Sequence, residues 1–299
     1  MTGWTATSRG FGRMLWGPPY SSSTMTAESK ATPEAVARHY DYITPFYEII
    51  ASRSLHFGYW PPGETGGSFG EAQQRFTEVM IQLLGSQKGH HVLDVGCGLG
   101  EPATRLAQST GCRVEGITIS ARQAAQAERW ASLHEMSGQT TFRCCDAMSL
   151  PFAAGSFDAA WALESIFHMP DRATVLRELA RVLHPGGRLL VADIVLSDKT
   201  TPEDRSFLQH AFVARSFISA EDYPYLIRDT GFEVEQVLDV TGNVMQTFDA
   251  LAAAVQGKEA EVRRAYSDEF LAAIQGQWAR IAETAKRCMG YVVITAKRQ

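Results

Sequence analysis

Side chains able to do chemistry gather in the stretch ALESIFHMPD, at 162–171. It contains a carboxylate, Glu164, and an imidazole, His168, with the aromatic Phe167 directly before the histidine. A further acid, Asp193, lies in LLVADIVL. Carboxylates and histidines accept protons in general base catalysis, and aromatic faces attract positive charge. We therefore expect a reaction centre that draws on these four residues.

Each polar member of this set also has a structural interpretation. His168 lies shortly before Pro170 and would then bond to backbone. Glu164 would be a buried, paired carboxylate at a strand end, and Asp193 would shape a turn at the next strand end. Both acids follow predicted parallel strands, whose carboxyl ends bind ligands in doubly wound folds. The position favours a functional role without excluding the structural one.

A glycine-rich loop, VLDVGCGLGEP, is the sharpest local signal. Its apolar strand ends in Asp94 and passes into Gly96, Gly98 and Gly100 before a helix. Glycines allow a tight turn and close approach to a ligand, while N–H groups at a helix start attract negative or polar groups. A dinucleotide fingerprint would require glycine in place of Glu101. The loop predicts a nucleotide-like cofactor, with a simple tight turn as the alternative.

The elements that must position these residues alternate between 91 and 196. Short apolar runs predict strands, and the patterns between them predict helices. Strands are expected at 91–97, 112–120, 140–147, 157–165 and 188–196, and helices at 102–110, 121–136 and 171–187. The last helix is expected to stop at the Pro-Gly-Gly of 185–187. This rhythm predicts an α/β fold with a doubly wound parallel sheet.

Helical segments flank this core on both sides. Lead-in helices are expected at 33–50 and 68–84, the second opening with a capping box from Ser68 to Glu71. The final third is less regular. It is expected to contain a mobile stretch at 197–219, a helix near 220–230, a strand at 232–241, helices through 286 and a closing strand at 290–298. The closing strand would suit an added antiparallel edge.

We expect one α/β domain at 33–299, preceded by an extension at 1–32. Insertions at about 33–70, 197–225 and 244–286 would form a lid and bind the acceptor. Ser, Thr and Gly in the extension favour a flexible arm, whereas its aromatic residues favour an arm exchanged between subunits of a homo-oligomer. Met25 is an alternative to Met1 as the native start.

Bulk properties narrow the class of partner. A net charge of −5 and a pI near 5.9 give no electrostatic footprint for nucleic acid or an anionic membrane surface. The five cysteines contain no C-x-x-C pair and no zinc-ligand spacing. No apolar run approaches the roughly 20 residues of a membrane span, and no signal peptide is evident. We expect a cytoplasmic protein with reduced thiols, no metal and a small-molecule partner.

Several motifs in order carry a family resemblance. LDVGCGLG, GITISARQAAQA, CCDAMSLPFAAGSFDAAWALES and LRELARVLHPGGRLLVADIVL resemble those of class I S-adenosylmethionine-dependent methyltransferases. The similarity is to the small-molecule, natural-product branch, which includes tocopherol and sterol C-, alkaloid N- and sugar O-methyltransferases. It covers 33–299 and implies a Rossmann-like seven-stranded sheet with S-adenosylmethionine as cofactor.

The resemblance also implies a set of cofactor-binding residues. They are Asp94, Gly96, Cys97 and Gly98 at the methionine part, Ile119 and Gln123 near the ribose, Asp146 and Ala147 at the adenine edge, Leu163, and Tyr40 and Trp60 over the methionine end. One departure is that the second strand ends GITIS, without the terminal acid that many class I enzymes place on the ribose. Gln123 can also complete a capping box with Ser120, and the two roles need not exclude each other.

The acceptor is the open question. The ALESIFHMPD stretch is similar to sugar O-methyltransferases with two consecutive histidines, of which this chain keeps only the second. With Phe167 and aromatics near 207–223, this favours an apolar acceptor. Our leading hypothesis is C-methylation of an alkene on a prenyl or terpenoid molecule, with possible cyclisation of the carbocation. The alternatives are O-methylation of a sugar or polyketide hydroxyl with His168 as base, and a non-methylating cyclase or binding protein.

Overall fold

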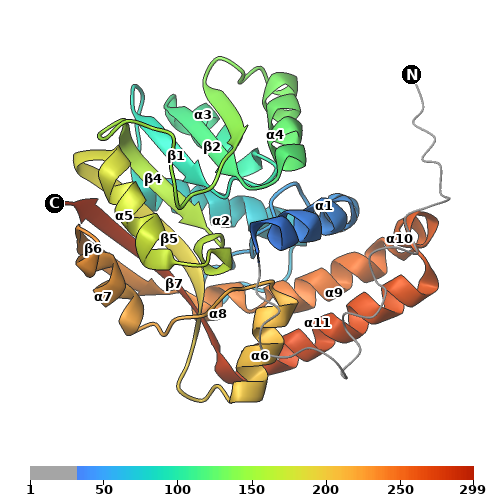
Figure 1. Cartoon of the computed structure of the whole chain (residues 1–299). Coiled ribbons are helices and arrows are strands. Elements are labelled where there is room, and N and C mark those ends of the chain that lie inside the picture. The colour runs from blue at the N-terminus through green and yellow to red at the C-terminus, as the bar shows by residue number, and fades with distance from the viewer. Residues whose placement is uncertain (1–31) are drawn as a thin grey trace.

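A computed structural model describes residues 32–299, which form one seven-stranded sheet with helices on both faces (Figure 1). The strands are β1 His91–Val95, β2 Arg113–Thr118, β3 Thr140–Cys144, β4 Phe157–Leu163, β5 Leu183–Leu196, β6 Phe232–Asp239 and β7 Met289–Arg298. The helices are α1 Pro33–Ile50, α2 Phe69–Leu84, α3 Glu101–Thr110, α4 Ala121–Leu133, α5 Arg172–Val182, α6 Pro202–Ala211, α7 Asp222–Asp229, α8 Thr241–Val244, α9 Thr247–Gly257, α10 Glu259–Ala265 and α11 Asp268–Cys288, with a 3-10 turn, η1, at Ile166–His168.

The strand order is β3-β2-β1-β4-β5-β7-β6, and the first five strands run parallel. The order reverses direction between β1 and β4, which pair with each other. Ligands of doubly wound sheets bind at the carboxyl ends of the strands beside such a switch point. Asp94 near the end of β1 and Glu164 just after β4 are thereby brought to the same crevice. The predicted doubly wound, Rossmann-like α/β fold is confirmed.

The closing strand β7 is antiparallel to β5, as expected, but it is not an edge strand. It lies between β5 and β6, so β6 forms the edge. Residues 291–296 of β7 are all buried, whereas only the first residue of β6 is. A strand buried on both faces needs neighbours on both sides, while exposed, charged residues protect an edge.

Two local expectations need correction. α5 ends at Val182 rather than at the Pro-Gly-Gly of 185–187, because β5 already begins at Leu183, which pairs with Phe157. The segment 197–219, expected to be mobile, contains α6. The signals for this helix were local, since Thr201 caps it and Pro202 occupies its first turn.

Both faces of the sheet carry a core. Side chains of α2, α3, α4 and α11 join one cluster with the strands, and side chains of α5 and α7 join the other. A third cluster links α1 with α9, α10 and α11, which extend away from the sheet (Figure 1). Its centre is an aromatic group that includes Phe46, Phe270 and Trp278. The lead-in and C-terminal insertions therefore pack on each other beside the carboxyl ends of the strands.

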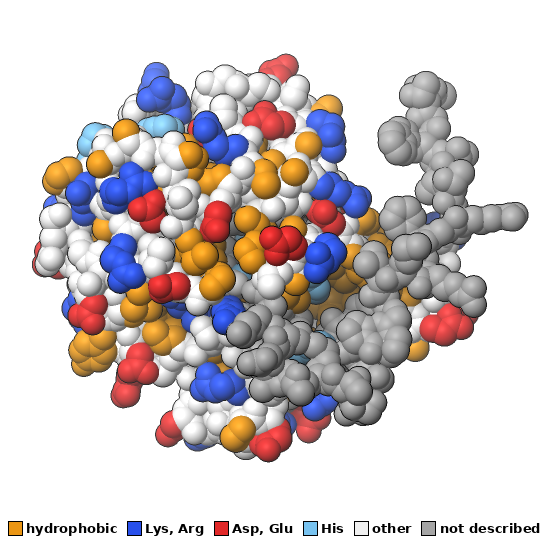
Figure 2. Space-filling view, viewed as in Figure 1, with side chains coloured by type: hydrophobic (Ala, Val, Ile, Leu, Met, Phe, Trp, Pro, Cys, Tyr) orange, Lys and Arg blue, Asp and Glu red, His pale blue; other side chains and the backbone are white. Residues whose placement is uncertain are grey.

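Several expectations concern the chain as a whole. The predicted N-terminal arm lies almost entirely in 1–31, outside the described residues. Within 32–299 no helix is both long and apolar enough to cross a membrane, and no group of His, Cys, Asp or Glu side chains is arranged to hold a metal ion. The cysteines of the described part are free thiols. On the face drawn in Figure 2, acidic and basic side chains are interspersed rather than segregated.

Candidate active site

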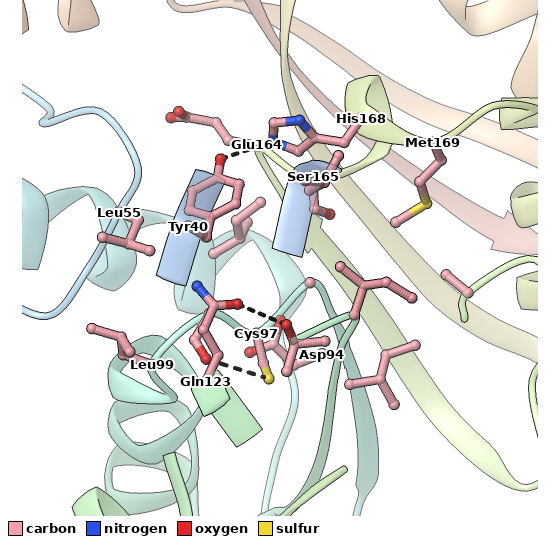
Figure 3. A pocket seen from close by; sticks show the side chains of 18 of the residues that line it. Tyr40, Leu55, Asp94, Cys97, Leu99, Gln123, Glu164, Ser165, His168 and Met169 are labelled. Carbon is pink, nitrogen blue, oxygen red and sulfur yellow. Dashed lines mark hydrogen bonds between the residues drawn. The ribbon is translucent and has the colours of Figure 1, made fainter. Parts of the chain in front are cut away.

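A cavity of about 1050 Å³, partly open to solvent, lies at the carboxyl ends of the central strands (Figure 3). The predicted cofactor residues lining it are Tyr40, Asp94, Gly96, Cys97, Gly98, Ile119, Gln123, Asp146, Ala147 and Leu163. They come from α1, the ends of β1 and β4, the glycine loop, the start of α4 and the segments after β2 and β3. Tertiary packing thus gathers almost the whole predicted set around one space.

Trp60 is the exception in that set. Its indole is buried and donates a hydrogen bond from Nε1 to the Gly66 carbonyl at 2.8 Å, in the core shared by α1 and α9. It is not among the residues lining the cavity. Leu55 and His56, from the same connection between α1 and α2, line the cavity instead. The segment expected to cover the methionine end therefore lines the cavity through Leu55 and His56, whereas its aromatic Trp60 packs in the core.

The glycine loop is shaped by its closest neighbour. Gly96 has a φ of 79°, and a Cβ at that position would lie 2.4 Å from the Cβ of Ser165. Ser165 is itself fixed, because its hydroxyl donates to the Val95 carbonyl at 2.6 Å. Any L side chain at Gly96 would therefore be strained and would clash. Glycine is therefore required at position 96 both by the turn and by Ser165, which lies just after β4.

Two charged groups in this cavity have unsatisfied atoms. Asp94 Oδ2 and Arg53 Nε are buried and have no hydrogen-bond partner within 32–299. Burial raises the pKa of Asp94 to about 7. Arg53 Nη1 is already paired with Glu48, and the Trp161 side chain opposes the rise in the pKa of Asp94. What remains for an amino acid moiety is Asp94 Oδ2, suited to its ammonium, and Arg53 Nε, suited to its carboxylate. Arg53 escaped the sequence analysis because it lies in an irregular segment without a motif, so the fit to the methionine part of the predicted cofactor is an independent observation.

Gln123 serves both the helix and the cavity. Its backbone N–H donates to the Ser120 hydroxyl at 3.0 Å, so Ser120 caps α4. The side chain does not complete the capping box. Its Oε1 accepts from the Thr118 hydroxyl at 2.7 Å, and the amide nitrogen is turned toward Tyr40 and the cavity (Figure 3). A donor placed here is suited to hydroxyl groups such as those of a ribose.

A second cavity, of about 910 Å³, lies between α1, the 55–57 segment, the end of α6, α9 and α11. Much of its wall is aromatic: Tyr47, Phe57, Phe167, Phe212, Phe248 and Trp278. Phe167, which we expect in the reaction centre, thus lines this second cavity and not the first. None of the side chains lining this cavity in the described part is lysine or arginine. The lining suits an uncharged, apolar molecule.

Four residues line both cavities and mark their junction: Tyr40, Leu55, His56 and Glu164. A group that passes between the occupants of the two cavities passes beside these side chains. His56 was not singled out by sequence, since it belongs to no motif. Tyr40 and Glu164 are the junction residues that the sequence did single out, and they come from α1 and from the turn after β4.

Glu164 is held in a strained position. Its φ of 49° lies in the left-handed region, which non-glycine residues seldom adopt. Its Oε1 accepts hydrogen bonds from the Phe57 N–H at 2.7 Å and from the Tyr291 hydroxyl at 2.9 Å. Burial nevertheless raises its pKa to about 8. The carboxyl is thus mostly protonated at neutral pH and titrates within reach of physiological conditions.

His168 lines the first cavity but not the second. Its Nδ1 lies 3.0 Å from the Val213 carbonyl and its Nε2 lies 2.8 Å from the Tyr40 hydroxyl. A carbonyl only accepts, so Nδ1 carries the hydrogen and Nε2 of the neutral ring accepts from Tyr40. Burial lowers the pKa of His168 to about 4, which favours this neutral form. Tyr40 stands between His168 and the second cavity.

Asp193 lies outside both cavities, contrary to expectation. It is fully buried, and its Oδ2 accepts from the Tyr223 hydroxyl at 2.8 Å. Burial raises its pKa to about 6. β5 ends at Leu196, where the predicted strand at 188–196 also ends, so Asp193 lies inside the sheet and not at the strand end to which the sequence analysis assigned it. It cannot contact an occupant of either cavity in this arrangement.

Comparisons with known proteins agree with this geometry. A family model described as a methyltransferase domain matches residues 93–191. The (+)-O-methylkolavelool synthase of Herpetosiphon aurantiacus is 35% identical over 278 residues, which cover 93% of this chain and 98% of that protein. Methyltransferase GfsG of Streptomyces halstedii is 37% identical over 267 residues, covering 85% and 94%. The solved structure of the cyclase SpnF has a TM-score of 0.77 at 30% identity, covering 89% of this chain and 97% of that one.

Proposed function

Because the chain belongs to the class I S-adenosylmethionine-dependent methyltransferases of natural-product type, we propose that it methylates a hydroxyl oxygen on an uncharged, apolar small molecule. Its enzyme class and its cofactor follow from the family. The acceptor atom and the acceptor class are the proposal. They rest on the two cavities and on the polar groups at their junction.

S-adenosylmethionine supplies an electrophilic methyl group on a sulfonium. In the first cavity, Asp94 and Arg53 are suited to its ammonium and carboxylate, and Gln123 to its ribose. Asp146 and Ala147 line the part of the cavity that the resemblance assigns to adenine. These contacts would fix the methyl group toward the junction with the second cavity. Holding two reactants in line supplies several kcal/mol of the barrier reduction, roughly 7–11 in favourable cases.

The direction of the hydrogen bonds from Tyr40 through His168 to Val213 is the observation that favours oxygen as the methyl acceptor. The Val213 carbonyl holds the hydrogen of His168 on Nδ1, and Nε2 therefore accepts the Tyr40 proton. With its own hydrogen committed, Tyr40 presents only oxygen lone pairs to the junction. A hydroxyl bound in the second cavity would donate to Tyr40 and keep a lone pair for methyl transfer. An alkene has no hydrogen to donate and would leave this arrangement unused.

The same chain removes the proton that a hydroxyl must lose. The acceptor hydroxyl gives its proton to Tyr40 Oη, and Tyr40 gives its own proton to His168 Nε2. His168 is neutral at pH 7 because burial lowers its pKa to about 4. It acts through Tyr40 rather than by touching the acceptor. A positioned base is worth roughly 10²- to 10⁴-fold in rate, and because the pKa of His168 lies well below neutral pH we expect a contribution at the lower end of that range.

The aromatic wall of the second cavity favours a second candidate, the C-methylation of an alkene that we expect from the sequence. Phe167 and its neighbours would stabilise a carbocation by roughly 0.5–2 kcal/mol for each well-placed ring. Glu164 lines both cavities, and its ionised form, whose share grows as pH rises toward its pKa of about 8, would receive the proton that the carbocation loses. A product with its methyl group on carbon would favour this candidate.

One experiment separates the candidates. The enzyme is incubated with methyl-labelled S-adenosylmethionine and pairs of terpenoid or polyketide acceptors that differ only in a hydroxyl group. We expect label on oxygen, only with the hydroxylated member, and one S-adenosylhomocysteine released for each product. Label on carbon would replace the proposal by the second candidate. Product formed without S-adenosylhomocysteine would instead indicate a cyclase, the activity for which SpnF is named.

A further inference from the structure

The loop at 212–217, after α6, packs on the turn that carries the site residues. The Arg215 N–H donates to the Phe167 carbonyl at 2.8 Å, and the Val213 carbonyl accepts from His168. Val213 has a φ of 50°, in the left-handed region that β-branched residues almost never adopt. Such strain persists only where surrounding contacts impose it. Part of that restraint comes from the end of α6, where the Ala214 N–H donates to the Gln209 carbonyl at 2.7 Å and the Gln209 side-chain amide donates to the Arg215 carbonyl at 3.2 Å. Further contacts from outside α6 fix where the loop lies against His168.

Arg172 makes two of the contacts from outside α6. This residue begins α5 and is 8% exposed. One terminal nitrogen donates to the Ser216 hydroxyl at 2.5 Å and the other to the Ser216 carbonyl at 2.6 Å. The planar guanidinium thus grips Ser216 at two points, which a lysine ammonium does not reproduce. Ser216 lies three residues after Val213, on the same short loop.

The charge of Arg172 is balanced inside the protein. The guanidinium lies 5.9 Å from the centre of the Tyr223 ring, and the Tyr223 hydroxyl donates to Asp193. The positive charge of Arg172 opposes the rise that burial causes in the pKa of Asp193. Neither Arg172 nor Asp193 lines a cavity. This buried group is accordingly placed to support the site without touching cofactor or acceptor.

We propose that Arg172 is a positioning residue: by clamping Ser216 it holds the Val213 carbonyl against His168 and so fixes the ring with its hydrogen on Nδ1. Nε2 is thereby left to accept from Tyr40. The inference rests on the proposed role of the Tyr40 and His168 pair. The charge of Arg172 also adds to burial and to His39 in lowering the pKa of His168, which keeps the resting ring neutral but opposes its uptake of the Tyr40 proton, so the contribution of Arg172 to turnover is the position of the ring. Asp193 supports Arg172 through Tyr223, whose hydroxyl donates to Asp193 and whose ring lies beside the guanidinium.

The test compares Arg172→Met and Arg172→Lys with Arg177→Met, an arginine on the same helix with a 58% exposed side chain. Nitrogen-15 NMR of the full chain reports the tautomer of His168, whose signals are assigned with His168→Gln. We expect Nδ1–H in the wild type and a mixture of tautomers in Arg172→Met. We expect kcat to fall about 10- to 100-fold, with cofactor Kd and acceptor KM little changed, because misplacement affects the reacting geometry. Arg172→Lys should recover part of the loss, and Arg177→Met should match the wild type.

A folded Arg172→Met enzyme with the wild-type tautomer and kcat would overturn the proposal. If that variant does not fold, Arg172→Lys and Ser216→Ala decide, and the wild-type tautomer in both would overturn it equally. The tautomer is measured without acceptor, so it tests Arg172 independently of methyl transfer. If Tyr40→Phe leaves turnover intact while Arg172→Met shifts the tautomer, the proposed function fails and the positioning role stands.

Discussion

Replacing Tyr40 by phenylalanine removes one hydroxyl from the junction of the two cavities. The ring of Tyr40 packs edge-on against His168, with 5.3 Å between the ring centroids, and this contact survives in the variant. What is lost is the 2.8 Å hydrogen bond to Nε2 and the only route from the second cavity to His168 that the described residues provide. The change therefore tests the proton relay while leaving the walls of both cavities in place.

The size of the effect follows from the role of the hydroxyl. Loss of a positioned proton acceptor costs roughly 10²- to 10⁴-fold in kcat. At about 1.36 kcal/mol for each factor of ten, this is about 3–5 kcal/mol of barrier. The buried Nε2 of His168 also loses its partner, which lowers the free energy of unfolding by about 1–3 kcal/mol. The rise in the barrier to turnover should thus exceed the fall in the free energy of unfolding, and the cofactor Kd should change little.

The assay measures kcat and acceptor KM at saturating cofactor, together with cofactor Kd and a thermal melt. Tyr42→Phe is the matched control, because Tyr42 lies two residues further along α1, packs against Phe270 and lines neither cavity. A folded Tyr40→Phe enzyme whose kcat stays within about threefold of the wild type would refute the relay, since a base contributes far more.

Three further changes test other parts of the site. Glu164→Gln keeps an oxygen for the Phe57 N–H but cannot take a proton, so turnover of an alkene acceptor should fall roughly 10²- to 10⁴-fold, with a far smaller loss for a hydroxylated one, in parallel kcat measurements. Gly96→Ala should abolish cofactor binding by calorimetry and lower the Tm, because its Cβ would lie 2.4 Å from that of Ser165; wild-type Kd would contradict the geometry. Asp94, whose pKa burial raises to about 7, should bind the cofactor more tightly as pH rises from 6 to 7 and its carboxylate forms. Asp94→Asn should lose this pH dependence and weaken binding about 10- to 100-fold, and an unchanged Kd profile would exclude a contact with the ammonium.

The features predicted from sequence were those with a local signature. The glycine loop, the strand and helix alternation and the capping box at Ser68 each depend on residues close together in the chain, and each is confirmed. The errors occurred where packing decides. β7 lies inside the sheet because both its faces are covered, and Asp193 is removed from the site because β5 extends past it.

The sequence by itself determined the α/β fold, the methyltransferase family and, through the family, the identity of the cofactor, because these follow from short motifs whose residues act together locally. Only the tertiary structure decided which side chains meet at the junction. Tyr40 and His168 are 128 residues apart, and no local pattern pairs them. Their contact exists because α1 packs over the carboxyl ends of the strands and the loop after α6 turns the Val213 carbonyl onto His168. These contacts between residues far apart in the chain set the direction of the hydrogen bonds at the site.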